Sequence, residues 1–135
     1  MNDDIRWHQR FQNFTNAYAT FCRTLQRQES EPEDEIIKMA LVQAFEFTYE
    51  LSWKVIKDFL EHEGFDDVLS PKKTIRTAFQ AELITDAEKW MDMIQKRNLA
   101  SHTYNETVLE ETVTYIRNDF FPLIRKLHED LKNHL

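Results

Sequence analysis

Hydrophobic residues recur at helical spacing from the start of the chain. The first set stands three and four positions apart, at Trp7, Phe11, Phe14, Tyr18, Phe21 and Leu25. This spacing forms one stripe of an amphipathic helix, predicted to run from Asp4 to Gln28. Five acidic residues then lie within residues 29–35, around Pro32. Because acidic side chains favour a helix N-terminus, this segment is interpreted as a solvated connection leading into a second helix.

The second predicted helix, from Asp34 to Glu63, is the longest apolar element. At about 100° per residue its hydrophobic positions fill an arc of about 200°. They are Ile37, Leu41, Ala44, Phe45, Tyr49, Leu51, Val55, Ile56, Phe59 and Leu60. A helix on the outside of a small bundle needs about half that arc. Either this helix is central or its second flank meets another chain, and we expect part of this face to form a homodimer contact. Gly64 fits the left-handed position after the last turn.

Capping residues mark the shorter elements. Ser70 is an N-cap candidate followed by Pro71 at the first helical position, which predicts a short third helix ending near Leu83. Thr85 or Asp86 can cap a fourth helix.

The final predicted helix follows a polar break at residues 103–105 and carries hydrophobic positions from Leu109 to Leu131. Pro122 has no N–H to donate to Asn118, so a kink is expected there. Together the elements predict an all-α fold. We expect one domain over residues 1–135, an up-and-down bundle of four main helices and a short one that dimerises.

Composition narrows the possible chemistry. One glycine in 135 residues disfavours β folds with tight turns and excludes a glycine-rich phosphate-binding loop. Cys22 stands alone, so it is interpreted as a core thiol in a reducing compartment, and the chain has no compact Cys/His set for zinc. No cofactor and no metal are expected.

The formal net charge of −7 disfavours nonspecific binding to nucleic acid through the whole surface. No apolar run approaches the ~20 residues of a membrane span, and the first residues lack the order of a signal peptide. We therefore expect a cytoplasmic protein without a membrane partner, in which any phosphate chemistry is local.

The stretch from Lys96 to Tyr104 carries the candidate chemistry. When the stripes of the fourth helix are extended, Arg97, Asn98, His102 and Tyr104 fall at positions expected to face the buried side. Polar groups there must be hydrogen-bonded or line a cleft, because an unpaired one costs about 1–3 kcal/mol. The set fits either a structural network or a functional site.

Arg97 and His102 suit an anionic ligand. The guanidinium is a permanently charged fork for phosphate, and the imidazole exchanges protons near neutral pH. On an ideal helix the two side chains point about 140° apart. Either the helix ends between them, or the site is completed across a dimer axis.

The spacing of Arg97, His102 and Tyr104 is the R-x4-H-x-Y motif of HEPN domains, and Asn98 is the residue often found after that arginine. Three further segments, residues 45–54, 70–76 and 121–123, resemble the branch called nucleotidyltransferase substrate-binding proteins, close to HepT. The resemblance spans nearly the whole chain. It implies a helical bundle that dimerises and works beside a minimal nucleotidyltransferase encoded as a separate chain.

The resemblance also implies roles for the motif residues. In HepT-like toxins the arginine and histidine cleave RNA without metal, in a cleft at the dimer interface. Arg97 would hold the scissile phosphate, His102 would be the acid or base, and Asn98 would orient the site. Tyr104 matches the tyrosine that the nucleotidyltransferase partner can adenylylate. Phe47, on the polar side of the second helix, is a candidate contact with the dimer mate or the nucleotidyltransferase.

Two functions stay open at this point. The first is a ribonuclease restrained by its nucleotidyltransferase partner; the second is a noncatalytic subunit that binds a nucleotide or acceptor for that partner through Arg97 and His102. Lys72, Lys73 and Arg76, with Lys96 and Arg97, are candidates for a basic track that binds RNA phosphates, although Lys72 and Lys73 equally fit a solvated face.

Overall fold

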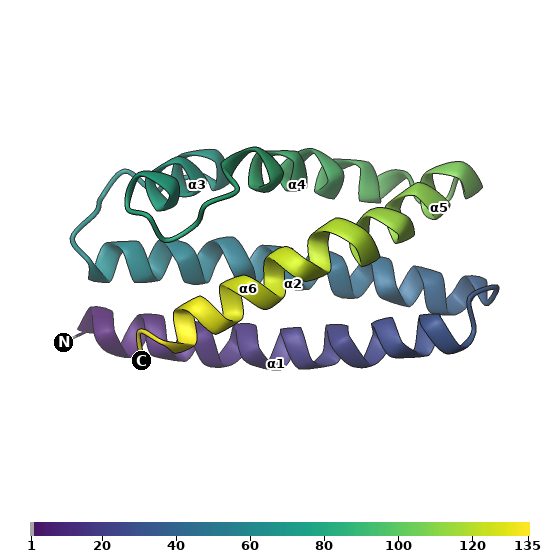
Figure 1. Cartoon of the computed structure of the whole chain (residues 1–135), viewed down its shortest axis with the longest axis horizontal. Coiled ribbons are helices and arrows are strands. Elements are labelled where there is room, and N and C mark those ends of the chain that lie inside the picture. The colour runs from purple at the N-terminus through teal and green to yellow at the C-terminus, as the bar shows by residue number, and fades with distance from the viewer. Residues whose placement is uncertain (1) are drawn as a thin grey trace.

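Two long antiparallel helices form the base of the molecule. A computed structural model describes residues 2–135, with side chains described from residue 4 onward. Helix α1 (Asn2–Ser30) packs along α2 (Glu35–His62) over most of their length (Figure 1). Both helices match the predicted bounds to within two residues.

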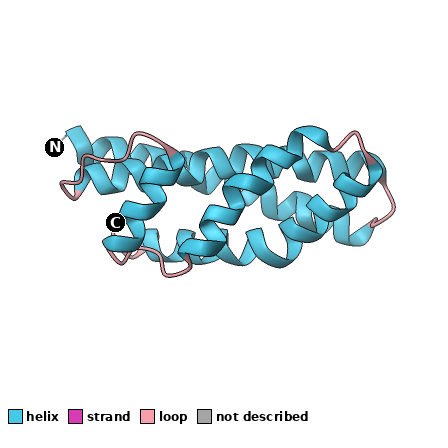
Figure 2. Cartoon of the chain, turned by 90° about the horizontal axis from the view of Figure 1, so that it is seen from above, coloured by secondary structure: helices cyan, strands magenta, loops and turns pink. Residues whose placement is uncertain are grey.

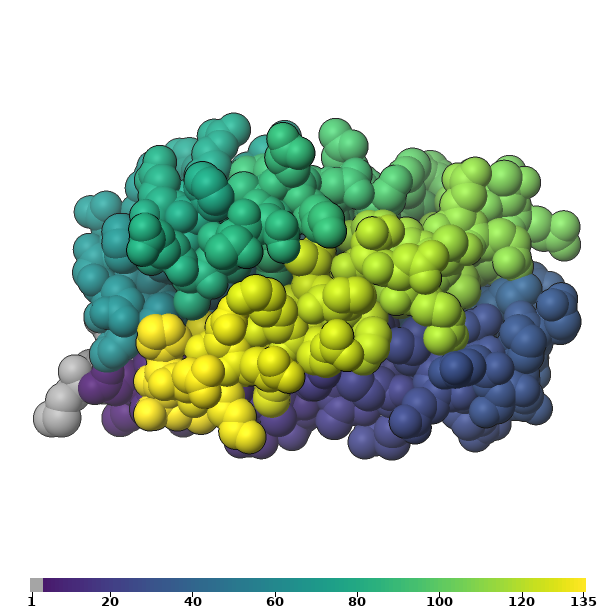
Figure 3. Space-filling model, viewed as in Figure 1, coloured from purple at the N-terminus to yellow at the C-terminus, as the bar shows by residue number. Residues whose placement is uncertain are grey.

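The rest of the chain returns over this pair. Helices α3 (Pro71–Gln80) and α4 (Ala87–Leu99) lie along one side of α2, and α4 continues into a 3-10 turn, η1 (Ala100–His102). The last segment consists of α5 (Glu106–Tyr115), a π-helical stretch η2 (Ile116–Phe120) and α6 (Phe121–Lys132). It runs diagonally between the α1 side and the α3–α4 side (Figure 3). The described residues contain no strand, and loops lie toward the two ends of the bundle (Figure 2).

Helix α2 is the central helix. It contacts α1 on one flank and α3 and α5 on the other, and eight of the ten residues of its predicted hydrophobic arc are buried. The wide hydrophobic arc is therefore explained by packing within one chain, and by itself it does not indicate a contact with a second chain. The all-α class and the bundle of four main helices plus a short one are confirmed.

Local capping explains where the helices begin and end. Asp34 accepts from the backbone N–H of Ile36 at 2.9 Å, and Ser70 accepts from that of Lys73 at 3.3 Å. Gly64 has a φ of +99°, as its position after α2 predicted. Asp86 occupies the N-cap of α4 but makes no capping hydrogen bond.

The third helix ends earlier than predicted, at Gln80 rather than near Leu83. Glu82 adopts a φ of +62°, and the N–H of Leu83 donates back to the carbonyl of Ala78 at 2.9 Å. This arrangement closes the helix with a left-handed residue that is not glycine, for which the sequence carries no signal.

The core is aromatic at its centre. Phe120 of η2 inserts between Phe21 of α1 and Phe45 of α2, with ring centroids 5.4 Å and 4.6 Å away. The π-helical stretch that carries Phe120 ends two residues before Pro122, so the regular α-helix is interrupted where the missing N–H of proline predicted a kink. Within residues 2–135 no helix is long and apolar enough to cross a bilayer.

Candidate functional site

Arg97 lies on the face of α4 that packs against the rest of the chain. Trp90, Met93 and Ala100 form the buried stripe of this helix, and Arg97 continues it with a side chain about one-third exposed. This placement brings its guanidinium to the edge of α2.

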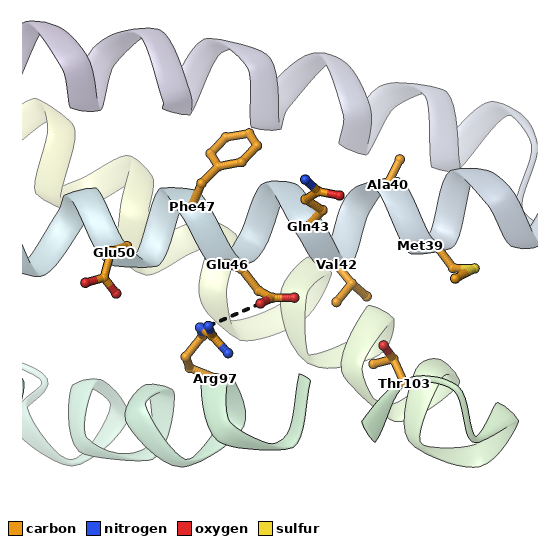
Figure 4. A pocket seen from close by; sticks show the side chains of 9 residues that line it. All are labelled: Met39, Ala40, Val42, Gln43, Glu46, Phe47, Glu50, Arg97 and Thr103. Carbon is orange, nitrogen blue, oxygen red and sulfur yellow. Dashed lines mark ion pairs between the residues drawn. The ribbon is translucent and has the colours of Figure 1, made fainter. Parts of the chain in front are cut away.

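Arg97 forms part of the wall of an open groove whose floor is the outer face of α2. The groove has a volume of about 630 Å³. Figure 4 shows Arg97 and Thr103 on one side of it and the α2 side chains along its length. The α2 side chains are Met39, Ala40, Val42, Gln43, Glu46, Phe47 and Glu50. The groove is lined by apolar and polar side chains in similar measure, and concave surfaces where a few polar groups converge among apolar ones are typical of binding sites.

An ion pair joins the groove wall to its floor. The Nη2 atom of Arg97 lies 3.2 Å from Oε2 of Glu46 (Figure 4). Glu50, one turn further along α2, also lines the groove, but its carboxylate contacts Lys54 at 3.4 Å and the indole N–H of Trp53 at 3.3 Å. Arg97 therefore meets one of the two groove carboxylates directly.

Two buried tyrosines lie close to the cations of α4. Burial raises the pKa of Tyr49 to about 12, against a small opposing effect of the nearby Arg97 charge. Burial also raises the pKa of Tyr115, and neighbouring Asp92 and Asp119 add to the shift. Lys96 lies over the Tyr115 ring, 5.7 Å from its centroid. Both phenols are therefore neutral at physiological pH.

The α-helix ends between Arg97 and His102, which is one of the two arrangements that the sequence left open; the other was a site completed across a dimer axis. Residues 100–102 form a 3-10 turn in which successive side chains rotate by about 120° instead of 100°. This change leaves the two side chains roughly opposite each other. His102 is exposed and is not among the residues that line the groove.

Tyr104 is 83% exposed and stands beside His102. Its hydroxyl lies 3.5 Å from Nδ1 of His102, a long contact, and the two rings meet edge to face. The following residue, Asn105, caps α5 by accepting from the N–H groups of Thr107 and Val108 at 2.9 and 3.2 Å. This cap fixes the turn that displays the tyrosine.

The expectation that all four motif side chains face the buried side is wrong for three of them. Asn98, His102 and Tyr104 are exposed, and Arg97 alone is partly buried. The reason is that α4 buries the stripe of Trp90 and Met93 rather than the neighbouring one that leads to Asn98 and His102. The chain past Ala100 then leaves α-helical geometry, so helical phase no longer places Tyr104.

The other candidate cations do not join Arg97 in the groove. Lys72, Lys73 and Arg76 are exposed on α3, at the end of the bundle where α2 ends, whereas Arg97 stands near the far end of α4 (Figure 1). Lys73 lies 3.6 Å from Asp67. A continuous basic track for RNA stays a prediction.

Sequence reasoning missed Glu46, Gln43 and Thr103 as groove residues. A glutamate on the polar flank of a helix carries no local signal of the distant side chain that it faces. Phe47 was the available clue, because an aromatic side chain on a polar flank marked this side of α2, and it does line the groove. Among residues 2–135, no three His, Cys, Asp or Glu side chains are grouped as a metal site requires.

Two solved structures share this architecture. One is a Haemophilus influenzae protein described as having the fold of a substrate binding domain of a nucleotidyltransferase; it is 27% identical, with a TM-score of 0.81, over 90% of this chain and 98% of that one. The other, from Thermus thermophilus, is 29% identical with a TM-score of 0.71, over 90% of this chain and 97% of that one.

A curated relative is similar over a shorter region. A Haemophilus influenzae protein named probable ribonuclease HepT is 39% identical over 83 residues, which are 58% of this chain and 56% of the relative. The match thus spans little more than half the length of that protein. The sequence profile described as nucleotidyltransferase substrate binding protein like matches residues 9–133, nearly the whole chain. The chain therefore belongs to the nucleotidyltransferase substrate-binding protein family.

Proposed function

We propose that this chain is a HepT-like, metal-independent endoribonuclease restrained by a separate minimal nucleotidyltransferase. The observation that carries the proposal is the arrangement of the R-x4-H-x-Y residues. Arg97 stands at the wall of an open groove, and His102 and Tyr104 are displayed on the turn that follows the same helix. The relative named probable ribonuclease HepT supports the same activity.

The residues have the chemistry for cleavage by internal transfer. The 2′-hydroxyl oxygen of the RNA attacks the adjacent phosphorus, and the bond from phosphorus to the 5′-oxygen breaks. One proton leaves the 2′-hydroxyl and one is delivered to the departing 5′-oxygen, which yields a 2′,3′-cyclic phosphate and a 5′-hydroxyl. His102 serves as the acid or the base, and Arg97 stabilises the added negative charge on the phosphoryl oxygens.

We propose that the site is completed by a second copy of the chain. Within one chain Arg97 turns into the α2 groove while His102 points elsewhere, so one helix does not aim both at one phosphorus. The groove floor includes exposed apolar side chains, Met39 and Phe47, which a second copy would cover. Such a pairing would bring Arg97 of one protomer toward His102 of the other.

Tyr104 is the proposed point of control by the nucleotidyltransferase. Its phenol oxygen would attack the α-phosphorus of ATP in the partner's active site, pyrophosphate would leave, and AMP would stay on the tyrosine. A side chain that is 83% exposed can reach such a site. The added phosphate would lie close to His102 and repel RNA by charge and by volume.

A noncatalytic binding subunit is the second candidate. Two observations favour it: the family is described by substrate binding, and the groove places Glu46 and Glu50 near its one arginine, Arg97. A groove with two carboxylates attracts RNA less than one lined by cations alone. The sequence suggested that Arg97 and His102 would both bind the phosphate of a nucleotide or acceptor for the nucleotidyltransferase. Because His102 does not line the groove, we propose that Arg97 alone would do so within one chain.

The activity is tested with purified chain, free of its partner, in excess EDTA. We expect RNA fragments ending in 2′,3′-cyclic phosphate, and we expect His102→Ala to abolish them. His8→Ala is the matched control, because His8 is another exposed histidine, near the start of α1 and outside the groove. If the wild-type chain leaves the RNA intact, the ribonuclease proposal is rejected and the binding-subunit proposal is kept.

The shared site is tested by mixing Arg97→Ala and His102→Ala chains that are inactive alone. If each site takes Arg97 from one protomer and His102 from the other, mixed dimers contain one intact site and cleavage returns. If both residues act within one chain, no mixed dimer has an intact site. A monomeric mass at micromolar concentration would also contradict the shared site.

A further inference from the structure

We propose that Glu46 is the positioning residue of Arg97. Its carboxylate holds the guanidinium at the groove wall by a single contact, Nη2 to Oε2 at 3.2 Å, from the middle of the long helix α2. Glu46 does not touch the substrate in this role; it acts through the arginine. The consequence for turnover rests on the proposed ribonuclease function, whereas the ordering of Arg97 does not.

The contact leaves most of the guanidinium available. Arginine carries five N–H donors in a planar fork, and the pair with Glu46 engages one end of it. The remaining donors suffice for a bidentate phosphate contact. A carboxylate that binds from one side therefore restricts the rotation of the fork without consuming it.

Neighbouring groups do not substitute for Glu46. Among the described residues, no other carboxylate lies within ion-pair distance of Arg97, and Arg97 is the only cation within that distance of Glu46. Glu50 is engaged by Lys54 and Trp53 instead. Without Glu46 the guanidinium, already one-third exposed, would turn into water among several rotamers, and a bound phosphate would have to order it anew.

The kinetic test compares Glu46→Ala and Glu46→Gln with Glu61→Ala and Glu61→Gln. The glutamine at 46 keeps an oxygen at the place of the contact, so we expect its kcat within about threefold of wild type, whereas Glu46→Ala lowers kcat about tenfold. Glu61 lies on the same helix and pairs with Lys57 and Arg6 outside the groove, so its variants remove a similar half-exposed charge, and we expect kcat to stay near wild type. Equal or faster turnover by Glu46→Ala would overturn the proposal.

Side-chain NMR tests the ordering without any need for activity. In the wild-type chain the guanidinium N–H signals of Arg97, assigned with Arg97→Lys, should show slow rotation of the end bound to Glu46. Glu46→Ala should speed this rotation, and both Glu61 variants should leave it unchanged. Ordering lost in Glu46→Ala while the wild type leaves RNA intact would uphold the inference and reject the ribonuclease. Unchanged rotation in Glu46→Ala would overturn the inference, whatever the activity.

Discussion

The ion pair between Arg10 and Asp58 should contribute to stability very unequally from its two ends. Asp58 of α2 is 3% exposed, and it accepts from Nε of Arg10 of α1 at 2.9 Å; the Arg10 side chain is 34% exposed. Arg10→Met keeps the aliphatic stem but leaves a buried carboxylate without its cation, which costs about 3–5 kcal/mol. Asp58→Asn leaves an arginine that reaches water, and we expect a loss of about 1 kcal/mol.

Urea unfolding at one protein concentration measures these losses. Arg6→Met is the matched control, because Arg6 is 54% exposed and lies 4.0 Å from Glu61; it should cost under about 0.5 kcal/mol. The double variant Arg10→Met with Asp58→Leu should be more stable than Arg10→Met alone, since it removes the stranded charge. Equal losses for Arg10→Met and Asp58→Asn would refute the reasoning.

Three further predictions concern stability. His128 stacks between Phe11 and Tyr18, and burial lowers its pKa below the ordinary 6.5, so folding favours its neutral form. The unfolding free energy should therefore be highest above pH 6.5, fall as the pH drops through that value, and level off once His128 is also protonated in the folded chain. His128→Gln should lose this pH dependence, as measured by urea titrations at several pH values. Within the part of the chain that the structure describes, the Tyr115 hydroxyl is buried without a hydrogen-bond partner, so Tyr115→Phe should raise the unfolding free energy by about 1 kcal/mol. A loss above about 1 kcal/mol would show that the hydroxyl has a partner in solution. Gly64→Ala should cost about 1–2 kcal/mol by thermal unfolding, entirely from the φ of +99°, because a Cβ there meets nothing within 4 Å.

Periodicity predicted the helices well because each long stripe is buried by the chain's own helices. The stripe from Trp7 to Leu25 is one example, since five of its six residues are buried. The interruption near Pro122 followed from covalent chemistry, because proline has no N–H. The left-handed conformation of Glu82 could not be predicted in this way, because it depends on how α3 packs and not on the Glu82 side chain.

The site was predicted less completely than the fold. Helix α4 carries two stripes of similar hydrophobicity, and spacing alone does not decide which one faces the core. The structure buries Trp90 and Met93, while Met91 and Ile94 stay half-buried. This choice separates Arg97, which turns inward, from His102, which stays exposed. The pairing of Arg97 with Glu46 required the packing of α4 against α2, which no short motif encodes.

The geometry of α4 links the two candidate functions to the oligomeric state. In the proposed ribonuclease, Arg97 and His102 would act at one phosphorus. One chain presents them in different directions, so this activity would need a second copy. Binding a phosphate needs Arg97 alone, which one chain already holds at its groove through Glu46. A stably monomeric chain would therefore favour the binding subunit. The opposite outcome would favour the ribonuclease. In that case the wild-type chain is a dimer that cleaves RNA, and replacing Phe47 by a charged residue abolishes cleavage while each chain stays folded.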